Sequence, residues 1–341
     1  MRSLGACFER PEARLLRQYA VPMRVLVTGG AGFIGSHLSD RLIADGHSVT
    51  VLDNLATGRL ENLAAAQATG KLTFIEGSIM DAALVEKLVA EADFTYHLAA
   101  AVGVFNILEH PLDSLMTNIR GTENVLEAAD KLHKEVLIAS SSEVYGKNVA
   151  DSLSEDDDRF MGSPLTLRWS YSQAKAIDET LAYAYFQEKN LQVRIVRFFN
   201  TVGPRQLGAY GMVVPRFVAS AIANEDITIY GSGTQTRCFG HVYDVVEALI
   251  QVTASQKTIG TVVNIGNSGE ISINDLAKKV IEITGSKSKI VHMSYEEAYA
   301  PGFEDMERRV PNITRIKALT GWVPTRNLET IIKDLVEYLK K

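Results

Sequence analysis

Tyr171 and Lys175 stand four residues apart in the segment WSYSQAKAIDE. On a helix this spacing places both side chains on one face, as neighbours. The pKa of a free phenol is about 10, too high for a base at neutral pH, but an ammonium group beside it favours the phenolate. We therefore expect Tyr171 to remove a proton from a hydroxyl group, with Lys175 lowering its pKa.

A glycine-rich turn about 140 residues upstream supplies the context for such a base. In RVLVTGGAGFIGSHLSDRLIADG, an apolar strand leads into Gly29, Gly32 and Gly35 and then into an amphipathic helix. Such a turn lets the backbone approach a pyrophosphate, and the helix N-terminus donates N–H groups to its oxygens. The strand, turn and helix order is the one in which this motif predicts a dinucleotide site.

Asp53 ends the second strand, HSVTVLDN, eighteen residues after Gly35. A carboxylate at this position accepts hydrogen bonds from the two ribose hydroxyls of a dinucleotide, and it repels a 2′-phosphate. The sequence therefore predicts NAD as the cofactor rather than NADP.

Composition narrows the class of protein further. The 341 residues are 46% hydrophobic, enough for two domains or one large α/β unit. The net charge of −6 comes from scattered charges of both signs, which argues against a nucleic-acid partner. Cys7 and Cys238 are too few for a disulfide framework, and the histidines lack metal-ligand spacing, so we expect no metal. No apolar run approaches the roughly 18 residues that span a bilayer, so we expect no membrane contact and a cytoplasmic location.

The order of elements predicts the fold. Residues 1–22 lack the continuous apolar region of a secretory signal and are interpreted as an N-terminal extension. From residue 23 to 200, strand and helix patterns alternate, which predicts an α/β protein with a Rossmann-type, doubly wound parallel sheet that forms the NAD-binding domain. The expected strands are 24–28, 48–53, 72–76, 93–98, 135–140 and 193–199. The expected helices lie near 34–45, 81–91, 112–132 and 170–189.

The alternation ends after about residue 200, where prolines and glycines separate short segments. Residues 201–341 are therefore interpreted as mainly a smaller C-terminal substrate-binding lobe. Within it, a helix at 241–254 and a strand at 262–266 are expected to return to the main sheet. A ligand would lie between the two lobes, at the carboxyl ends of the strands.

Five ordered motifs carry a resemblance to a known family: TGGAGFIG, HLAA, SSSEVYG, YSQAK and FFNTVGPR. They resemble the extended short-chain dehydrogenases/reductases that modify nucleotide sugars, over essentially all of residues 23–341. Within that family, DNLATGR, NTVGPR and YGSGTQTRCF most resemble the UDP-glucuronate decarboxylases (UDP-xylose synthases), and the UDP-sugar 4-epimerases come next.

The resemblance implies a tightly held NAD and a UDP-sugar substrate that is oxidised at carbon 4. Tyr171 would take the proton of that hydroxyl, Lys175 would hold the nicotinamide ribose, and Ser141 would hydrogen-bond the reacting oxygen. The residues implied to contact NAD, besides Tyr171 and Lys175, are Gly29, Gly32, Phe33, Ile34, Gly35, Asp53, Asn54, Leu98, Ala99, Ala100 and Asn118.

Residues beside Ser141 bear on what the 4-keto sugar becomes. Ser142 stands where the related dehydratases carry an acid, which disfavours loss of a hydroxyl group. The decarboxylases carry a Glu at the position of Glu143 and pair it functionally with an Arg, here Arg237. For Arg237 a contact with the substrate diphosphate, as in the epimerases, is the alternative, and for Glu143 it is a structural role.

Further substrate contacts follow from the same resemblance. Asn200, Arg205 and Arg309 would hold the diphosphate, and Ser142 and Arg237 would also line the substrate site. The segment 100–104 is closer to the epimerases, so 4-epimerisation of UDP-glucose/galactose or UDP-glucuronate/galacturonate stays open. The resemblance also implies a homodimer through the helices near 112–132 and 170–189.

Overall fold

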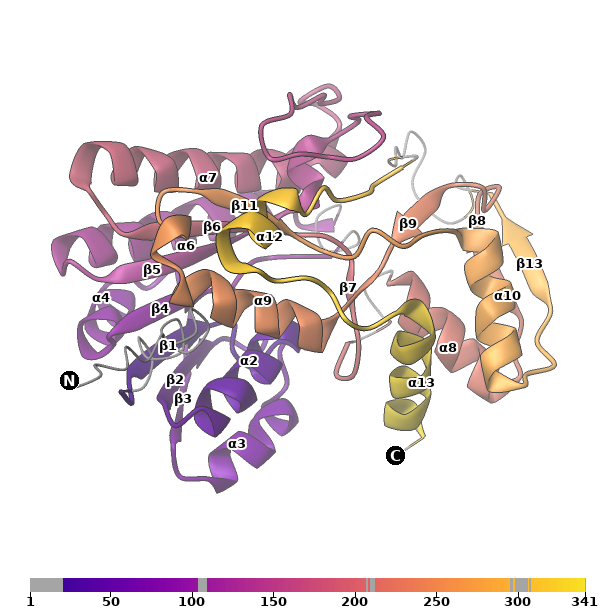
Figure 1. Cartoon of the computed structure of the whole chain (residues 1–341), viewed down its shortest axis with the longest axis horizontal. Helices are drawn as coiled ribbons and strands as arrows, with labels where there is room; N and C mark the ends of the chain where they lie inside the picture. Colours follow the sequence, from indigo (N-terminus) through magenta and orange to yellow (C-terminus); the bar gives the residue numbers. More distant parts are fainter. Residues whose placement is uncertain are drawn as a thin grey trace, which may run out of the picture.

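In the computed structural model of the chain, seven parallel strands form the central sheet in the order β11-β6-β5-β4-β1-β2-β3 (Figure 1). The chain winds outward from β1 in one direction and then returns through β4 in the other. This arrangement confirms the predicted doubly wound sheet, and it places a switch point between β1 and β4. The strands are β1 (Arg24–Thr28), β2 (Ser48–Asp53), β3 (Leu72–Glu76), β4 (Phe94–His97), β5 (Glu135–Ser141), β6 (Val193–Phe198) and β11 (Val262–Ile265).

The structure describes residues 21–103, 109–206, 208, 212–294, 297, 306 and 308–340. Residues 1–20, which make up nearly all of the expected N-terminal extension, lie outside this set.

Helices cover both faces of the sheet because each buried strand alternates its side chains between two cores. In β1, Val25 and Val27 pack into one core, and Leu26 packs into the other. The first core includes residues of α2 (Phe33–Ala44) and α9 (Val242–Ala254). The second includes residues of α4 (Ala82–Glu91), α6 (Pro111–Lys131) and α7 (Ser170–Lys189).

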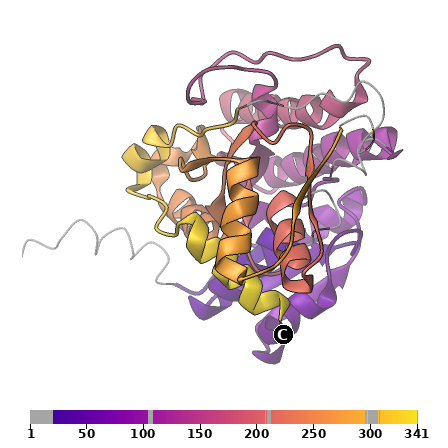
Figure 2. The same cartoon turned by 90° about the vertical axis from the view of Figure 1, so that its right-hand side faces the viewer.

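A second, smaller lobe has a core of its own, and Figure 2 shows it facing the viewer. Phe217, Ile229, Leu276 and Leu335 are fully buried in this core. Its helices are α8 (Val213–Ala223), α10 (Ile273–Thr284) and α13 (Leu328–Leu339). Its strands pair as β8 (Ile227–Tyr230) with β13 (Ile290–Met293), and β9 (Thr236–Cys238) with β12 (Glu270–Ser272).

The expected return of the chain to the main sheet is present. β11 pairs with β6, and α9 packs against α2. Two further short strands, β7 (Thr201–Val202) and β10 (Gly240–His241), pair with each other, and α12 (Thr314–Thr320) packs beside β11. The ends of the strands and helices predicted before residue 200 differ from the observed ends by at most one residue. The division into cofactor and substrate domains stays a prediction.

Candidate active site

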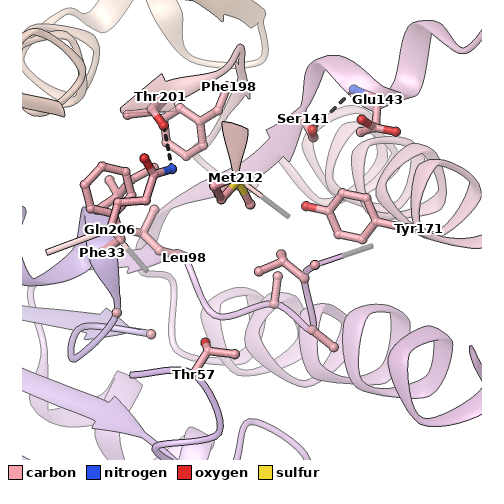
Figure 3. A pocket seen from close by; sticks show the side chains of 18 of the residues that line it. Phe33, Thr57, Leu98, Ser141, Glu143, Tyr171, Phe198, Thr201, Gln206 and Met212 are labelled. Carbon is pink, nitrogen blue, oxygen red and sulfur yellow. Dashed lines mark hydrogen bonds between the residues drawn. The ribbon is translucent and has the colours of Figure 1, made fainter. Parts of the chain in front are cut away.

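A cavity of about 700 Å³ extends from the glycine turn after β1 to residues of the smaller lobe. It lies at the carboxyl ends of the strands, where a doubly wound sheet binds its ligands. Every residue predicted for the site except Asn118 lines this cavity. Figure 3 shows Tyr171 directing its hydroxyl into it, with Ser141 and Glu143 alongside.

The glycine turn has the shape that close approach of a ligand requires. Gly29 has φ +71°, and a Cβ atom there would lie 2.7 Å from the backbone nitrogen of Ala99. A side chain at this position would therefore be strained and would collide with the backbone of the segment that follows β4. Gly32 is the N-cap of α2, so the first N–H groups of this helix face the cavity. These features fit a bound pyrophosphate.

Asp53 is held in place by two backbone amides. Its Oδ2 accepts a hydrogen bond from the N–H of Ala31 (2.9 Å), and its Oδ1 accepts one from the N–H of Leu55 (2.8 Å). A carboxylate has about four lone-pair sites, so acceptor capacity remains for the hydroxyls of a ribose. The geometry therefore fits the adenosine ribose of NAD.

Replacing Asp53 with Ala is expected to weaken NAD binding by about tenfold or more, the effect of losing hydrogen bonds to a charged group. The affinity for NADP should fall less, because the variant no longer repels a 2′-phosphate. Calorimetric titration with both dinucleotides measures the ratio. Glu225→Ala, at an exposed site, is the control. A ratio of NAD to NADP affinity that stays at the wild-type value would remove Asp53 from this role.

Tyr171 and Lys175 both lie on α7, one turn apart, as predicted. Ser141 ends β5, and its Oγ accepts a hydrogen bond from the N–H of Glu143 (3.2 Å), which caps the short 3₁₀ helix η3 (Ser142–Tyr145). Burial raises the pKa of Tyr171, and a hydrogen bond with Ser141 offsets a small part of that rise. Ser141 and Tyr171 therefore face the same point in the cavity.

The electrostatics of Tyr171 differ from the sequence-based expectation. Burial, followed by the carboxylates of Glu143 and Asp178, raises the pKa of Tyr171 above its ordinary value. Lys175 was expected to lower it, but its Nζ lies 3.0 Å from Oδ2 of Asp178, and both side chains are buried. The negative charge of Asp178 lies beside the ammonium group of Lys175. It therefore offsets the effect by which that ammonium group would lower the pKa of Tyr171.

Glu143 lies between two arginines. Its Oε2 is 2.7 Å from Nη1 of Arg168, and its Oε1 is 2.8 Å from Nη2 of Arg309. Burial by itself raises the pKa of Glu143, but the guanidinium groups of Arg309 and Arg168 outweigh it and lower the pKa to about 2. Glu143 is therefore ionised at neutral pH and cannot serve as a proton donor in this state.

Arg309 reaches Glu143 because a distant loop holds its segment. The N–H of Leu153 donates to the carbonyl of Val310 (2.8 Å), and the N–H of Asn312 donates back to the carbonyl of Leu153 (2.9 Å). Arg309 also donates from Nη1 to Oγ of Ser142 at 3.4 Å. Its expected contact with the diphosphate stays a prediction, whereas its ion pair with Glu143 was not foreseen.

Arg168 is a site residue that sequence reasoning missed. It is buried in the 3₁₀ helix η4 (Leu167–Trp169), directly before α7, and it lines the cavity. The available signal was its position three residues before Tyr171, since residues at this spacing share a helix face.

The ion pairs of Glu143 give a pH-dependent stability. Because the pKa is lowered in the folded protein, the stabilisation is fully present above the ordinary value of 4.5 and is lost as the pH falls toward 2. We expect Glu143→Gln to be less stable than the wild type at neutral pH, with a difference that shrinks between pH 4.5 and about 3. Urea unfolding of both proteins across this range measures it. A difference that is constant with pH would contradict the assignment.

The other predicted substrate residues occupy separate parts of the cavity wall. Arg237 lies on β9 and donates from Nη1 to the carbonyl of Thr236 (2.8 Å). Arg205 has φ +68°, and its Nη2 lies 2.7 Å from Oδ2 of Asp40. The amide of Asn200 donates to the carbonyl of Cys238 (3.1 Å). Their roles toward a substrate, and the functional pairing of Arg237 with Glu143, stay predictions.

Asn118 lies on the helix beside the cavity. It is buried on α6, where its Oδ1 accepts from the N–H of Ala101 (2.9 Å) and its Nδ2 donates to the carbonyl of Ala101 (3.2 Å). Both ends of the Asn118 amide therefore hydrogen-bond the backbone of Ala101, which lines the cavity, whereas Asn118 itself does not line it. Its expected contact with NAD stays a prediction.

Two further classes of site find no support in the part of the chain that the structure describes. No group of three or more His, Cys, Asp or Glu side chains there could hold a metal ion. Within the same residues, no helix has the length and apolar character needed to cross a membrane.

A glycine turn at the switch point of a parallel sheet, with a Tyr–Lys pair in the same cavity, defines a short-chain dehydrogenase/reductase. The chain belongs to the GDP-mannose 4,6-dehydratase family, which it matches over residues 26–335.

Several characterised proteins are similar over most of their length. UDP-N-acetyl-alpha-D-glucosaminuronate decarboxylase of Bacillus cytotoxicus is 41% identical, over 93% of this chain and 98% of that protein. UDP-glucuronic acid decarboxylase 1 of Xenopus tropicalis is 38% identical, over 93% of this chain and 72% of that protein. The crystal structure of UDP-glucuronic acid 4-epimerase from Bacillus cereus, in complex with UDP-glucuronic acid and NAD, matches with a TM-score of 0.84 at 28% identity, over 93% of this chain and 99% of that one.

Proposed function

We propose that this protein is an NAD-dependent decarboxylase that converts UDP-glucuronate to UDP-xylose through a 4-keto intermediate. The observation that carries the proposal is the buried cluster of Arg168, Glu143 and Arg309 beside Tyr171. Decarboxylase relatives at 38 to 41% identity over most of the chain support it.

The cluster argues against the dehydration for which the family is named. Dehydration needs an acid that protonates a leaving hydroxyl group. Ser142 is not such an acid, and the arginines keep Glu143 ionised. Two guanidinium groups and one carboxylate leave one positive charge in the cluster, which suits a sugar that carries a carboxylate.

The oxidation relies on residues at the carboxyl end of β5 and on α7. When bound, NAD supplies a reversible acceptor for hydride. The glycine turn would hold its pyrophosphate, Asp53 its adenosine ribose and Lys175 its nicotinamide ribose. Tyr171 takes the proton of the carbon-4 hydroxyl, and Ser141 hydrogen-bonds the same oxygen.

The oxidised sugar is a β-keto acid, which loses carbon dioxide readily when its carboxylate is oriented correctly. The bond from carbon 5 to the carboxylate must lie parallel to the π orbital of the carbon-4 ketone, so that its electron pair can move into the ketone. Holding the sugar at this angle is the role proposed for Glu143 and Arg237. One proton is consumed as carbon 5 gains hydrogen, and Tyr171 returns its own proton to oxygen 4 when the ketone is reduced.

Mass spectrometry of the products from a panel of UDP-sugars tests the proposal. We expect UDP-glucuronate to yield UDP-xylose and an equal amount of carbon dioxide. Formation of UDP-galacturonate without carbon dioxide would instead establish a 4-epimerase that acts on UDP-glucuronate. Interconversion of UDP-glucose and UDP-galactose would establish a 4-epimerase that acts on neutral sugars.

UDP-N-acetylglucosaminuronate is the second candidate substrate, because the relative at 41% identity is named for it. The chemistry at carbons 4 and 5 is unchanged, and the two substrates differ only at carbon 2. Comparing kcat/KM for both UDP-sugars in the same panel decides between them.

We further propose a homodimer formed through α6 and α7, which pack side by side. Leu112 on α6 and Ile177 and Tyr183 on α7 are exposed apolar side chains that support it. Light scattering of the wild type and of Ile177→Glu tests this assembly, since a buried charge would dissociate it. A cytoplasmic location also stays a prediction.

A further inference from the structure

A buried carboxylate that the proposed mechanism does not use lies against Lys175. Asp178 is one turn further along α7, and its Oδ2 accepts a hydrogen bond from Nζ of Lys175 at 3.0 Å. The side chain of Asp178 is fully buried and that of Lys175 is 2% exposed. Burial raises the pKa of Asp178, and Lys175 and the hydroxyl of Thr122 on α6, which both hydrogen-bond the carboxylate, partly offset that rise. A buried carboxylate is costly to keep, so its contact with Lys175 calls for an explanation.

This pair belongs to a buried polar chain that ends at the glycine turn. The hydroxyl of Thr122 on α6 faces Asp178 and hydrogen-bonds Nε2 of His97 on β4 (3.1 Å). Nδ1 of His97 lies 2.8 Å from the hydroxyl of Thr28, the residue before Gly29. Burial and the nearby Lys175 lower the pKa of His97 to about 3, so its ring is neutral and serves as a bridge. The proposed binding sites for the nicotinamide ribose and the pyrophosphate of NAD are thus joined through the protein interior.

We propose that Asp178 is a positioning residue, which holds the ammonium group of Lys175 for the nicotinamide ribose and tunes the charge beside Tyr171. The inference rests on the roles proposed for Tyr171 and Lys175, and it does not depend on what the 4-keto sugar becomes.

The positioning follows from the donors of an ammonium group. Lys175 has three N–H donors on a flexible four-carbon stem. One of them bonds Asp178, which selects one orientation of the side chain and leaves two donors for the two ribose hydroxyls. Without Asp178, this orientation must be established at the moment of binding, at a cost in entropy.

The effect on Tyr171 follows from the charges around it. Burial is the largest cause that raises its pKa. Glu143 from η3, which is paired with Arg168 and Arg309, and Asp178 from α7 raise it further, whereas Ser141 from β5 lowers it. The neighbours of Asp178 add no unpaired charge. Thr122 from α6 and His97 from β4 are neutral. Glu179 of α7 is charged, but it accepts hydrogen bonds from Arg197 of β6 and Ser140 of β5. When the negative charge of Asp178 is removed, the positive charge of Lys175 is no longer compensated. We therefore expect the pKa of Tyr171 to fall.

Two substitutions separate the two effects. Asp178→Asn keeps an oxygen that accepts from Lys175 but removes the charge. Asp178→Leu has a similar volume and removes both. Glu188→Gln, at an exposed position on the same helix, is the matched control for loss of charge. Thermal unfolding of each variant shows whether it folds, and Asp178→Ala, which also removes both, replaces the Leu variant in every measurement if that one does not fold.

The first measurement is the dissociation constant of NAD by calorimetry, which needs no sugar. We expect a rise of about tenfold for Asp178→Leu and a value within about threefold of the wild type for Asp178→Asn. Wild-type affinity in a folded Leu variant would overturn the positioning role.

The second measurement is the pH dependence of kcat/KM with whichever UDP-sugar is turned over. Oxidation needs the deprotonated phenol, so the rate rises with pH through the pKa of Tyr171. For Asp178→Asn we expect this rising limb to move to lower pH by about one unit, while Glu188→Gln leaves it in place. A limb that coincides with that of the wild type would show that Asp178 does not act on Tyr171. Failure of the decarboxylase proposal would appear separately, in the identity of the product.

Discussion

Replacing Tyr171 with Phe is expected to lower turnover by about 10²- to 10⁴-fold, the usual contribution of a positioned acid or base. The phenol is partly buried at the wall of the cavity. Its hydroxyl faces the open space (Figure 3), and Ser141 hydrogen-bonds it. Phe keeps the ring and removes only the hydroxyl, so the cavity should retain its shape. NAD should therefore stay bound, as measured by its content in the purified protein.

Tyr338→Phe is the matched control, because Tyr338 lies on α13 and is 38% exposed. It should turn over at the wild-type rate. Wild-type turnover by Tyr171→Phe would instead remove Tyr171 from the proposed role, whatever the product proves to be.

Replacing Glu143 with Gln is expected to lower the rate of carbon dioxide release by about 100-fold, the scale of a misplaced reacting group. A neutral amide can accept a hydrogen bond from one guanidinium group, but its NH₂ group then faces the donors of the other. The cluster of Arg168, Glu143 and Arg309 should therefore rearrange, and the sugar carboxylate should lose its orientation. Trapping of labelled carbon dioxide from UDP-glucuronate measures the effect, with Glu188→Gln as the control.

The outcome of this substitution also bears on the choice between the two proposed reactions. Carbon dioxide release at the wild-type rate would make Glu143 a structural residue and would favour the epimerase. A loss of carbon dioxide release with sugar oxidation retained, seen as accumulated NADH, would locate the defect after the oxidation, as the decarboxylase proposal requires.

Local patterns in the sequence were sufficient to predict the doubly wound parallel sheet. Val25, Leu26 and Val27 are consecutive apolar residues, so the strand has an apolar side chain on each of its two faces. This pattern predicts helices on both sides of the sheet. The spacing of Gly29, Gly32 and Gly35 defines one turn, and the spacing of Tyr171 and Lys175 defines one helix face. In these cases a few consecutive residues determine the geometry, because the backbone between them is regular.

The partners of the site residues could not be predicted in the same way. Glu143 is paired with Arg309, 166 positions away in the chain, and this contact depends on the hydrogen bonds that hold the segment around Val310 against Leu153. Arg168 is near in sequence, but its contact with Glu143 depends on how α7 packs against η3. Neither contact leaves a periodic pattern in the sequence.

The sequence by itself thus determined the doubly wound fold, the dinucleotide turn and the presence of a Tyr–Lys pair, since each depends on short-range spacing in a regular backbone. Only the tertiary structure decided the charges around that pair. Lys175 and Asp178 are neighbours on α7 by their spacing of three residues, but the packing of the chain buried both side chains and placed two arginines around Glu143. The pKa of a buried group depends on which charges the packed chain brings within a few ångströms of it.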